Sequence, residues 1–248
     1  MNIIVSVFNV SAEYRYLDVA LKSLWPAFVQ IKEDWNTFSP RPISDYNNER
    51  NILFQYLRGI DPDRPDESIA NWVDGQINMA ATKQRSDQFS DPLMTQYVLI
   101  TMLSHALCEA AINAILVWGL AQMNSQELFA GVEKKNIIDK WLEPKILFPN
   151  SNYELPKGTA LFGTLKYLTA QRNSLVHSKI QVNYGVEKDF KRSKGHRPLI
   201  EKINWMHRFF SLPYDLSEHV RSQLSSHAIF ILYDRGPIPR ADVHKKST

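Results

Sequence analysis

The stretch Leu93–Gln122, LMTQYVLITMLSHALCEAAINAILVWGLAQ, is the segment that decides the fold class. A run of this length and apolar content predicts a helix. The apolar part between Tyr97 and Ala121 is long enough to resemble a membrane span, but it contains His105, Glu109 and Asn113. Ionisable side chains are costly in the middle of a bilayer. We therefore expect a buried core helix of a soluble protein, with no membrane partner.

The composition of the 248 residues is that of a globular protein, with 44% apolar and 22% charged residues. The formal net charge of +3 is too small to indicate nucleic-acid binding unless it is concentrated in one place. A single cysteine, Cys108, excludes a disulfide within the chain and disfavours a zinc site built from cysteines. The N-terminus has no basic segment before its short apolar run, so it does not resemble a secretory signal. We expect a cytoplasmic protein.

Working outward from Leu93, apolar periodicity, caps and breakers predict a series of further helices. They cover residues 11–32, 49–57, 67–85 (weakly), 126–142 (as one or two helices), 159–178, 199–210 and 217–226. Breaks are expected at SDQFSDP (86–92), over 144–156, in the polar segment 182–198 and at the SLPYD turn. Residues 1–10 and 228–234 have strand character. The predicted fold is all-α, with an N-terminal helical region (1–90), a helical domain (91–226) and a C-terminal short strand and tail (227–248).

The helix expected over residues 159–178 has one unusual feature, an arginine on its apolar side. Successive side chains turn by about 100°, which places Leu161, Leu165, Leu168, Leu175 and Val176 in one stripe. Arg172 falls in the middle of this stripe. A guanidinium there is costly unless it is paired or borders a water-filled cleft. Arg172 therefore either reaches the helix edge, forms a structural salt bridge, or belongs to a functional site.

His177 lies near the expected end of the same helix. Asn173 and His177 are four residues apart and share a face, whereas Arg172 and His177 are roughly 140° apart around the axis. A straight helix would not direct both at one point, so the helix deforms or a second chain completes a site. Alternatively, His177 is a surface residue that interacts with the helix dipole.

The segment Arg172-Asn173-Ser174-Leu175-Val176-His177 resembles the R-N-x-x-x-H motif of HEPN domains, which are compact helical bundles with this motif near the end of a late helix. The wider pattern LxxLxxxRNxxVHxK begins at Leu165 and ends at Lys179. An earlier apolar helix with a Glu/Asn pair is also typical, and it corresponds here to HALCEAAINAILVW. The resemblance covers about residues 93–226 and leaves residues 1–90 unexplained.

The resemblance implies a metal-independent endoribonuclease without a cofactor, of the kind found among toxins and phage-defence effectors that have an antitoxin or regulatory partner. It also implies a homodimer in which two motifs form one composite cleft. Arg172 and His177 would be catalytic, and Asn173 and Glu109 would support them. Many members have tyrosine two residues after the histidine, whereas this chain has Lys179. Some members are non-catalytic modules that bind a nucleotide or a protein, which is the alternative, and a helical scaffold without a site is a third hypothesis.

The proposed chemistry needs a proton-transfer group and a fixed positive charge. Histidine titrates near neutral pH, and arginine can bind two phosphate oxygens at once. Cationic side chains around and after the motif either form a solvated loop or attract the RNA backbone. They are Lys179, Lys188, Lys191, Arg192, Lys194 and Arg197.

Glu109 has the same helical spacing from His105 and Asn113, four residues on either side. These side chains form a buried polar network between helices, or Glu109 pairs with Arg172 and positions its guanidinium. A His/Glu metal site is the third interpretation, but the sequence shows no further ligand.

Overall fold

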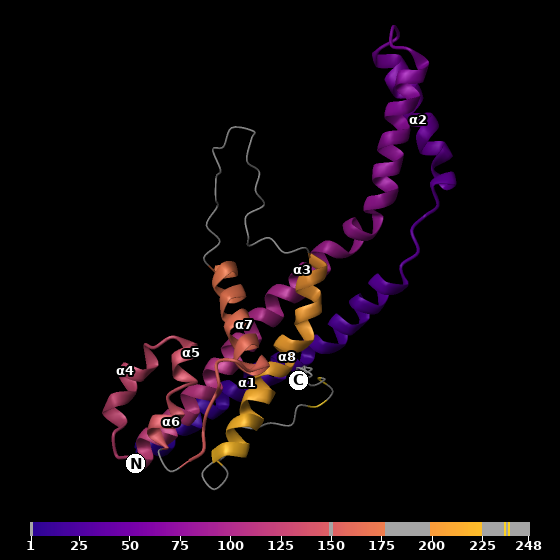
Figure 1. Cartoon of the computed structure of the whole chain (residues 1–248). Coiled ribbons are helices and arrows are strands. Elements are labelled where there is room, and N and C mark those ends of the chain that lie inside the picture. The colour runs from indigo at the N-terminus through magenta and orange to yellow at the C-terminus, as the bar shows by residue number, and fades with distance from the viewer. Residues whose placement is uncertain (1, 149–150, 177–198, 225–235, 237, 239–248) are drawn as a thin grey trace, which may run out of the picture. The chain divides into compact units, whose positions relative to one another are not determined.

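The computed structural model describes residues 2–148, 151–176 and 199–224, together with residues 236 and 238. Every regular element in these ranges is a helix (Figure 1), which confirms the predicted all-α class. The elements are α1 (Asn2–Thr37), η1 (Ile43–Tyr46), α2 (Asn47–Ile60), α3 (Asp66–Gln122), η2 (Gln126–Leu128), α4 (Phe129–Glu133), α5 (Ile137–Lys140), α6 (Pro144–Leu147), α7 (Ala160–Val176) and α8 (Leu199–Leu224).

The chain divides into two compact units. We call Met1–Ala27 together with Gln96–Thr248 the core unit, and Phe28–Thr95 the hairpin unit. The sequence predicted a boundary at residue 90 and placed residues 1–27 in the N-terminal region. In the structure these residues group with the C-terminal part of the chain instead, because side chains of α1 pack against α8.

The C-terminal half of α3 supplies much of the interior of the core unit. Leu107, Cys108, Ile112 and Leu116 are completely buried. Asp66–Ala121 contains a segment long and apolar enough to cross a membrane, yet 56% of that segment is already buried within the protein. Length and composition alone therefore give weak evidence for a membrane span.

Helices α7 and α8 pack against each other in the core unit. The ring centroids of Tyr167 and Trp205 are 4.5 Å apart, and Phe209 lies 5.8 Å from Tyr167. Phe209 also contacts Tyr97 of α3, at 6.4 Å between centroids. Aromatic contacts therefore join α3, α7 and α8 close to the RNSLVH segment.

A polar contact joins α1 to the middle of α8. The Tyr214 hydroxyl donates to Asp18 Oδ1 at 2.6 Å, and Lys22 donates to the other carboxylate oxygen at 3.0 Å. The predicted turn at SLPYD is wrong, because α8 runs through Pro213 without a break. Proline costs a helix about 3 kcal/mol, but Leu212 and Leu216 on either side are fully buried, and burial of the continuous helix offsets that cost.

The predicted strand at residues 1–10 is also wrong, because residues 2–10 form the start of α1. A strand needs a neighbouring strand to satisfy its backbone groups, and no strand occurs in the ranges that the structure describes. A helix satisfies the same groups internally. The second predicted strand, residues 228–234, lies outside the described residues, as does the predicted loop 182–198.

The connection between α3 and α7 contains the short helices η2, α4, α5 and α6. Helix α6 lies at the start of the segment that was expected to be irregular. The ring of Phe148, just after α6, stacks on Trp118 with 5.1 Å between centroids. A Cβ atom on Gly119 would lie only 2.8 Å from Phe148 Cζ, so this close approach to α3 depends on glycine.

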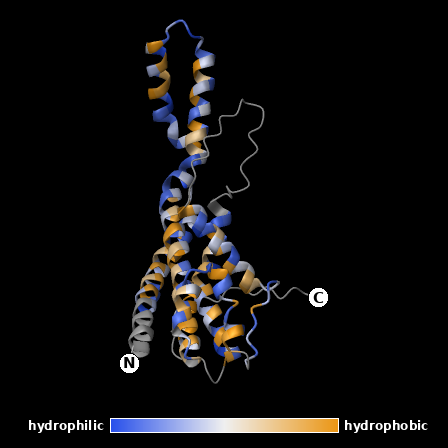
Figure 2. Cartoon of the chain, turned by 90° about the vertical axis from the view of Figure 1, so that its left-hand side faces the viewer, coloured by the Kyte–Doolittle hydropathy of each residue, from blue (hydrophilic) through white to orange (hydrophobic). Residues whose placement is uncertain are grey.

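The hairpin unit contains α2 packed against the first part of α3. Ile69, Val73 and Ile77 of α3 are buried, and apolar side chains of α2 and the preceding turn pack on them: Tyr46, Leu53, Phe54 and Leu57. The five residues between α2 and α3 reverse the chain, so the two helices run antiparallel. Hydrophobic and hydrophilic residues alternate along both helices (Figure 2).

Helix α3 passes through Pro92, so the predicted break at residues 86–92 is wrong. Phe89 is 7% exposed and Leu93 is completely buried. Phe89 contacts Trp35 and Phe38 edge-on, with centroids 5.9 and 5.6 Å apart. Burial on both sides of the proline holds the helix together despite the lost backbone hydrogen bond.

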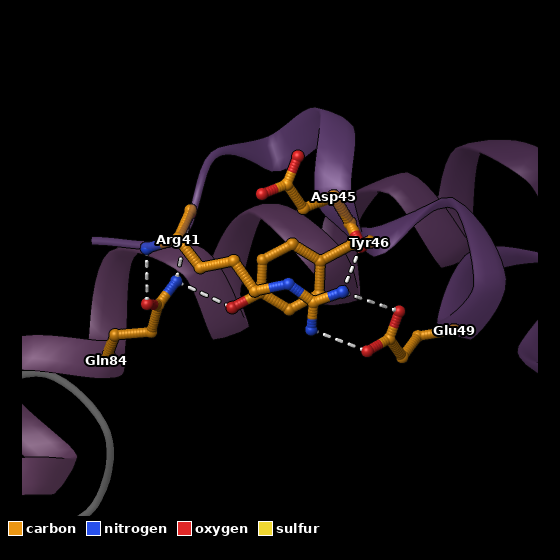
Figure 3. A network of polar contacts seen from close by, with 5 residues as sticks. All are labelled: Arg41, Asp45, Tyr46, Glu49 and Gln84. Atoms are coloured by element: carbon orange, nitrogen blue, oxygen red, sulfur yellow. Dashed lines mark hydrogen bonds and ion pairs between the residues drawn. The ribbon is translucent and has the colours of Figure 1, made fainter. Parts of the chain in front are cut away.

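A polar network fixes the segment that leads from α1 into α2 (Figure 3). The Arg41 guanidinium lies 4.2 Å from the centre of the Tyr46 ring and donates to both oxygens of Glu49, at 2.6 and 3.2 Å. Gln84 of α3 accepts from the Arg41 amide at 2.8 Å and donates to the Tyr46 hydroxyl at 2.6 Å. The hydrogen bond from Arg41 lowers the pKa of Glu49. The network thus ties this segment to α3.

Candidate functional site

The RNSLVH segment begins in the last turns of α7, which ends at Val176, and His177 lies outside the described residues. The predicted apolar stripe is confirmed at Leu165 and Leu168, which are completely buried. It does not extend to Val176, which is 46% exposed. Arg172 is partly exposed, and its Nη1 donates to the Asn173 side chain at 3.1 Å. The arginine therefore lies at the edge of the apolar surface.

Gln171, the residue before the motif arginine, anchors α7 to α3. The Tyr97 hydroxyl donates to Gln171 Oε1 at 2.6 Å, and Tyr97 is only 1% exposed. The ammonium group of Lys202 from α8 lies 5.4 Å from the centre of the same ring. Three helices therefore meet beside the motif, and this contact anchors the part of α7 that carries Arg172.

Glu109 forms an ion pair with a lysine that the sequence did not single out. Its Oε1 atom lies 2.8 Å from Nζ of Lys140, the last residue of α5. The lysine side chain is 1% exposed and the glutamate side chain 39%. The interpretation of Glu109 as part of a polar network between helices is thus the one that the geometry favours. The alternative, in which Glu109 pairs with Arg172, is not observed, and the carboxylate pairs with Lys140 instead.

The burial of Lys140 could have been predicted from the sequence. Ile137, Lys140 and Trp141 have the i, i+3, i+4 spacing of one helix face. All three are buried. A lysine between two large apolar residues on one face needs a carboxylate partner. The segment EKKNIIDKW contains several lysines, which concealed the one that points inward.

His105 lies one helical turn before Glu109 and is 8% exposed. Burial is the main cause that lowers its pKa below the usual 6.5. The carboxylate of Glu109 acts in the opposite direction, and the positive charges of Arg172 and Lys140 lower the pKa further. Arg172 is therefore close enough to influence the electrostatics of this cluster, although it forms no ion pair with Glu109.

We call His105, Glu109 and Lys140, together with the nearby Arg172, the polar cluster. The first three come from α3 and α5, where Glu109 and Lys140 form an ion pair, whereas Arg172 of α7 is linked to them only by its charge, which lowers the pKa of His105. The cluster contains three basic groups and one carboxylate. Across the part of the chain that the structure describes, no group of three or more His, Cys, Asp and Glu side chains is arranged to hold a metal ion. What the cluster offers chemically is positive charge from arginine and lysine, together with a buried imidazole.

The six predicted RNA-contacting residues all lie outside the described residues: Lys179, Lys188, Lys191, Arg192, Lys194 and Arg197. Their role stays a prediction. The distribution of charge between the units is nevertheless informative. Acidic residues outnumber basic ones over residues 28–95, so the net positive charge of the chain belongs to the core unit. Polyanion attraction, where it occurs, is expected there.

No model of a known protein family, no curated protein and no solved structure matches this chain. The class of the protein is thus defined by its own features, an all-α fold with the polar cluster beside the end of α7.

Proposed function

We propose that this protein is a metal-independent endoribonuclease of the HEPN type. The observation that carries the proposal is the spacing of Arg172 and His177 in the RNSLVH segment, whose first five residues are the last turns of α7. Through Gln171 this helix contacts Tyr97 of α3, the long apolar helix with the Glu/Asn pair. The chemistry of the two side chains suits cleavage of a phosphodiester. Enzymes of this type are often toxins or phage-defence effectors, and an antitoxin or regulatory protein is the partner that such a role would imply.

The reaction would use the 2′-hydroxyl of the RNA as nucleophile. The oxygen attacks the adjacent phosphorus and loses its proton, while the bond to the 5′-oxygen breaks and that oxygen gains a proton. His177 would move these protons, since imidazole is half-protonated near neutral pH. The products are a 2′,3′-cyclic phosphate and a 5′-hydroxyl end.

Arg172 would stabilise the extra negative charge that develops on the phosphorane oxygens. Its partial exposure at the edge of the apolar surface of α7 leaves the guanidinium accessible to a phosphate. Asn173, which accepts its hydrogen bond, would hold its orientation. Glu109 would act indirectly, by neutralising Lys140 and so controlling how much positive charge surrounds Arg172.

Two chains are expected to share the site. On one straight helix Arg172 and His177 diverge by roughly 140°, so a second copy related by a two-fold axis is the simplest way to bring both groups to one phosphate. The cationic residues from Lys179 to Arg197 would attract the RNA backbone.

The test is cleavage of a labelled single-stranded RNA by the wild type, Arg172→Ala and His177→Ala. Both substitutions should reduce the rate by about 100-fold or more, as is usual for a lost proton-transfer group or charge-stabilising group. Lys166→Ala is the matched control, because Lys166 is an exposed cation on the same helix. Equal rates in all variants, or 3′-hydroxyl product ends, would refute the proposal. RNA that is bound but not cleaved by the wild type would indicate a non-catalytic binding module.

A further inference from the structure

Helix α2 has apolar side chains on two faces, and only one of them packs against the rest of the hairpin unit. Leu53, Phe54 and Leu57 contact the buried residues of α3. Ile52, Tyr56 and Ile60 are instead 61%, 65% and 62% exposed. These three are spaced at i, i+4 and i+8 and therefore form a stripe along the helix. No residue of α2 is fully buried. The second stripe is therefore an apolar surface of α2 that α3 does not cover.

Helix α3 adds two more exposed apolar side chains, Trp72 at 41% and Met79 at 45%. At about 100° per residue, both are displaced by roughly 110° from the direction of the buried Ile69, Val73 and Ile77. Ile52, Tyr56 and Ile60 are displaced in the same rotational sense from the inward side chains of α2. Because the helices run antiparallel, equal rotations about the two axes lead to the same side of the hairpin.

We call this side, formed by Ile52, Tyr56, Ile60, Trp72 and Met79, the apolar face. The opposite side of the hairpin carries ion pairs. Arg50 Nε lies 2.9 Å from Asp74 Oδ1, and Arg58 Nη1 lies 3.1 Å from Asp66 Oδ1. The hairpin therefore has one charged side suited to water and one side that lacks charge along most of its length.

Within α2 and the part of α3 that belongs to the hairpin unit, only two charged residues point to the same side as the apolar face. Both lie at the end of the hairpin that is far from the loop between α2 and α3. These are Glu49, whose charge is balanced by Arg41 at 2.6 Å, and Lys83. An interface core that is poor in charge can meet an identical surface without repulsion. Acidic residues outnumber basic ones over 28–95, which disfavours an anionic lipid surface as the occupant.

The area of the apolar face is sufficient for a weak but specific association. If a large side chain offers about 200 Å², the exposed fractions amount to about 500 Å² per copy. Two identical faces would then bury about 1,000 Å², the lower limit for a specific interface. Two hairpins packed in this way would form a four-helix bundle, in which each helix buries its second apolar stripe.

We infer that the apolar face is a self-association surface, on which the hairpin unit of a second copy of this chain packs about a two-fold axis. The inference uses residues of the hairpin unit alone and does not depend on whether the protein cleaves RNA.

The test compares dissociation constants of the full-length chain by sedimentation equilibrium. The variant Ile52→Glu/Tyr56→Glu introduces two carboxylates into the apolar face and should weaken dimerisation by about tenfold or more, because like charges would meet across the two-fold axis. Gln55→Glu/Asn78→Glu is the matched control, because it adds the same charge at exposed positions away from this face. The control should dimerise like the wild type, and circular dichroism should show the same helix content in all three proteins.

A second measurement introduces no charge into the apolar face. Trp72→Cys should be cross-linked between copies by a flexible bis-maleimide more readily than Asn78→Cys, since residue 72 lies on the apolar face, residue 78 lies away from it and the native Cys108 is buried. A monomeric wild type, or an unchanged dissociation constant in the variant, would overturn the inference. So would wild-type binding to phosphatidylcholine vesicles that the variant loses. RNA cleavage is scored separately: a hairpin dimer without activity would refute only the proposed function, and activity without hairpin association only this inference.

Discussion

Replacing Glu109 with glutamine would remove the carboxylate that lies 2.8 Å from the Lys140 ammonium while preserving the shape of the side chain. The two partners differ strongly in exposure, at 1% for the lysine and 39% for the glutamate. The substitution therefore leaves a positive charge in a place that water hardly reaches. Lys140→Met is the opposite perturbation, because it removes the buried charge and leaves the carboxylate at the surface.

The cost of Glu109→Gln follows from this asymmetry. Leaving one member of a buried ion pair without its partner costs about 3–5 kcal/mol. Glu109 is more than one-third exposed, so solvent already screens part of the interaction, and the glutamine oxygen can still accept a hydrogen bond. We therefore expect a loss of about 2 kcal/mol in the free energy of unfolding. Lys140→Met should cost about 1 kcal/mol or less, because methionine replaces the apolar stem and the free carboxylate can be hydrated.

Urea denaturation followed by circular dichroism would measure the wild type, both single variants and Glu109→Gln/Lys140→Met. The double variant should be close in stability to Lys140→Met alone, since glutamine no longer faces a buried charge. This makes the two substitutions strongly non-additive. A Lys140→Met variant that is less stable than Glu109→Gln, or additive effects, would show that the ion pair is not the buried interaction inferred here.

Two further predictions concern the core unit. Tyr214→Phe removes the 2.6 Å hydrogen bond to Asp18, which is 4% exposed, and should cost about 1–2 kcal/mol in urea denaturation; a change below about 0.3 kcal/mol would contradict a stabilising role for this hydrogen bond. Because the pKa of His105 is lowered in the folded protein, the unfolded chain binds a proton more readily than the folded chain. The contribution of neutral His105 to the free energy of unfolding is therefore complete above about pH 6.5. It is lost as the pH falls from there through the lower pKa of the folded protein. His105→Asn should lose less stability than the wild type when the pH is lowered from about 8 to about 5, and an equal loss in both proteins would show that other groups cause it.

The candidate site could be predicted from the sequence only as far as local spacing reaches. Helix α7 and its buried Leu165 and Leu168 follow from periodicity. The RNSLVH segment identified Arg172, Asn173 and His177 as candidate residues of the site. The partner of Glu109 is 31 residues away along the chain, and no local pattern connects the two. Whether Glu109 pairs with Arg172 or with Lys140 depends on which side of α5 faces α3.

The sequence by itself determined the all-α class, the burial of α3 beyond Tyr97 and the existence of α7, because these depend on hydrophobic periodicity within one segment. The tertiary structure decided the continuity of α3 through Pro92 and of α8 through Pro213. A proline lowers the local preference for helix by a fixed amount, and only the burial of neighbours such as Leu93 and Leu212 shows that packing exceeds it. The same holds for the apolar face: the stripe Ile52, Tyr56 and Ile60 is visible in the sequence, but only the packing of Leu53 and Leu57 on α3 shows which stripe is left exposed.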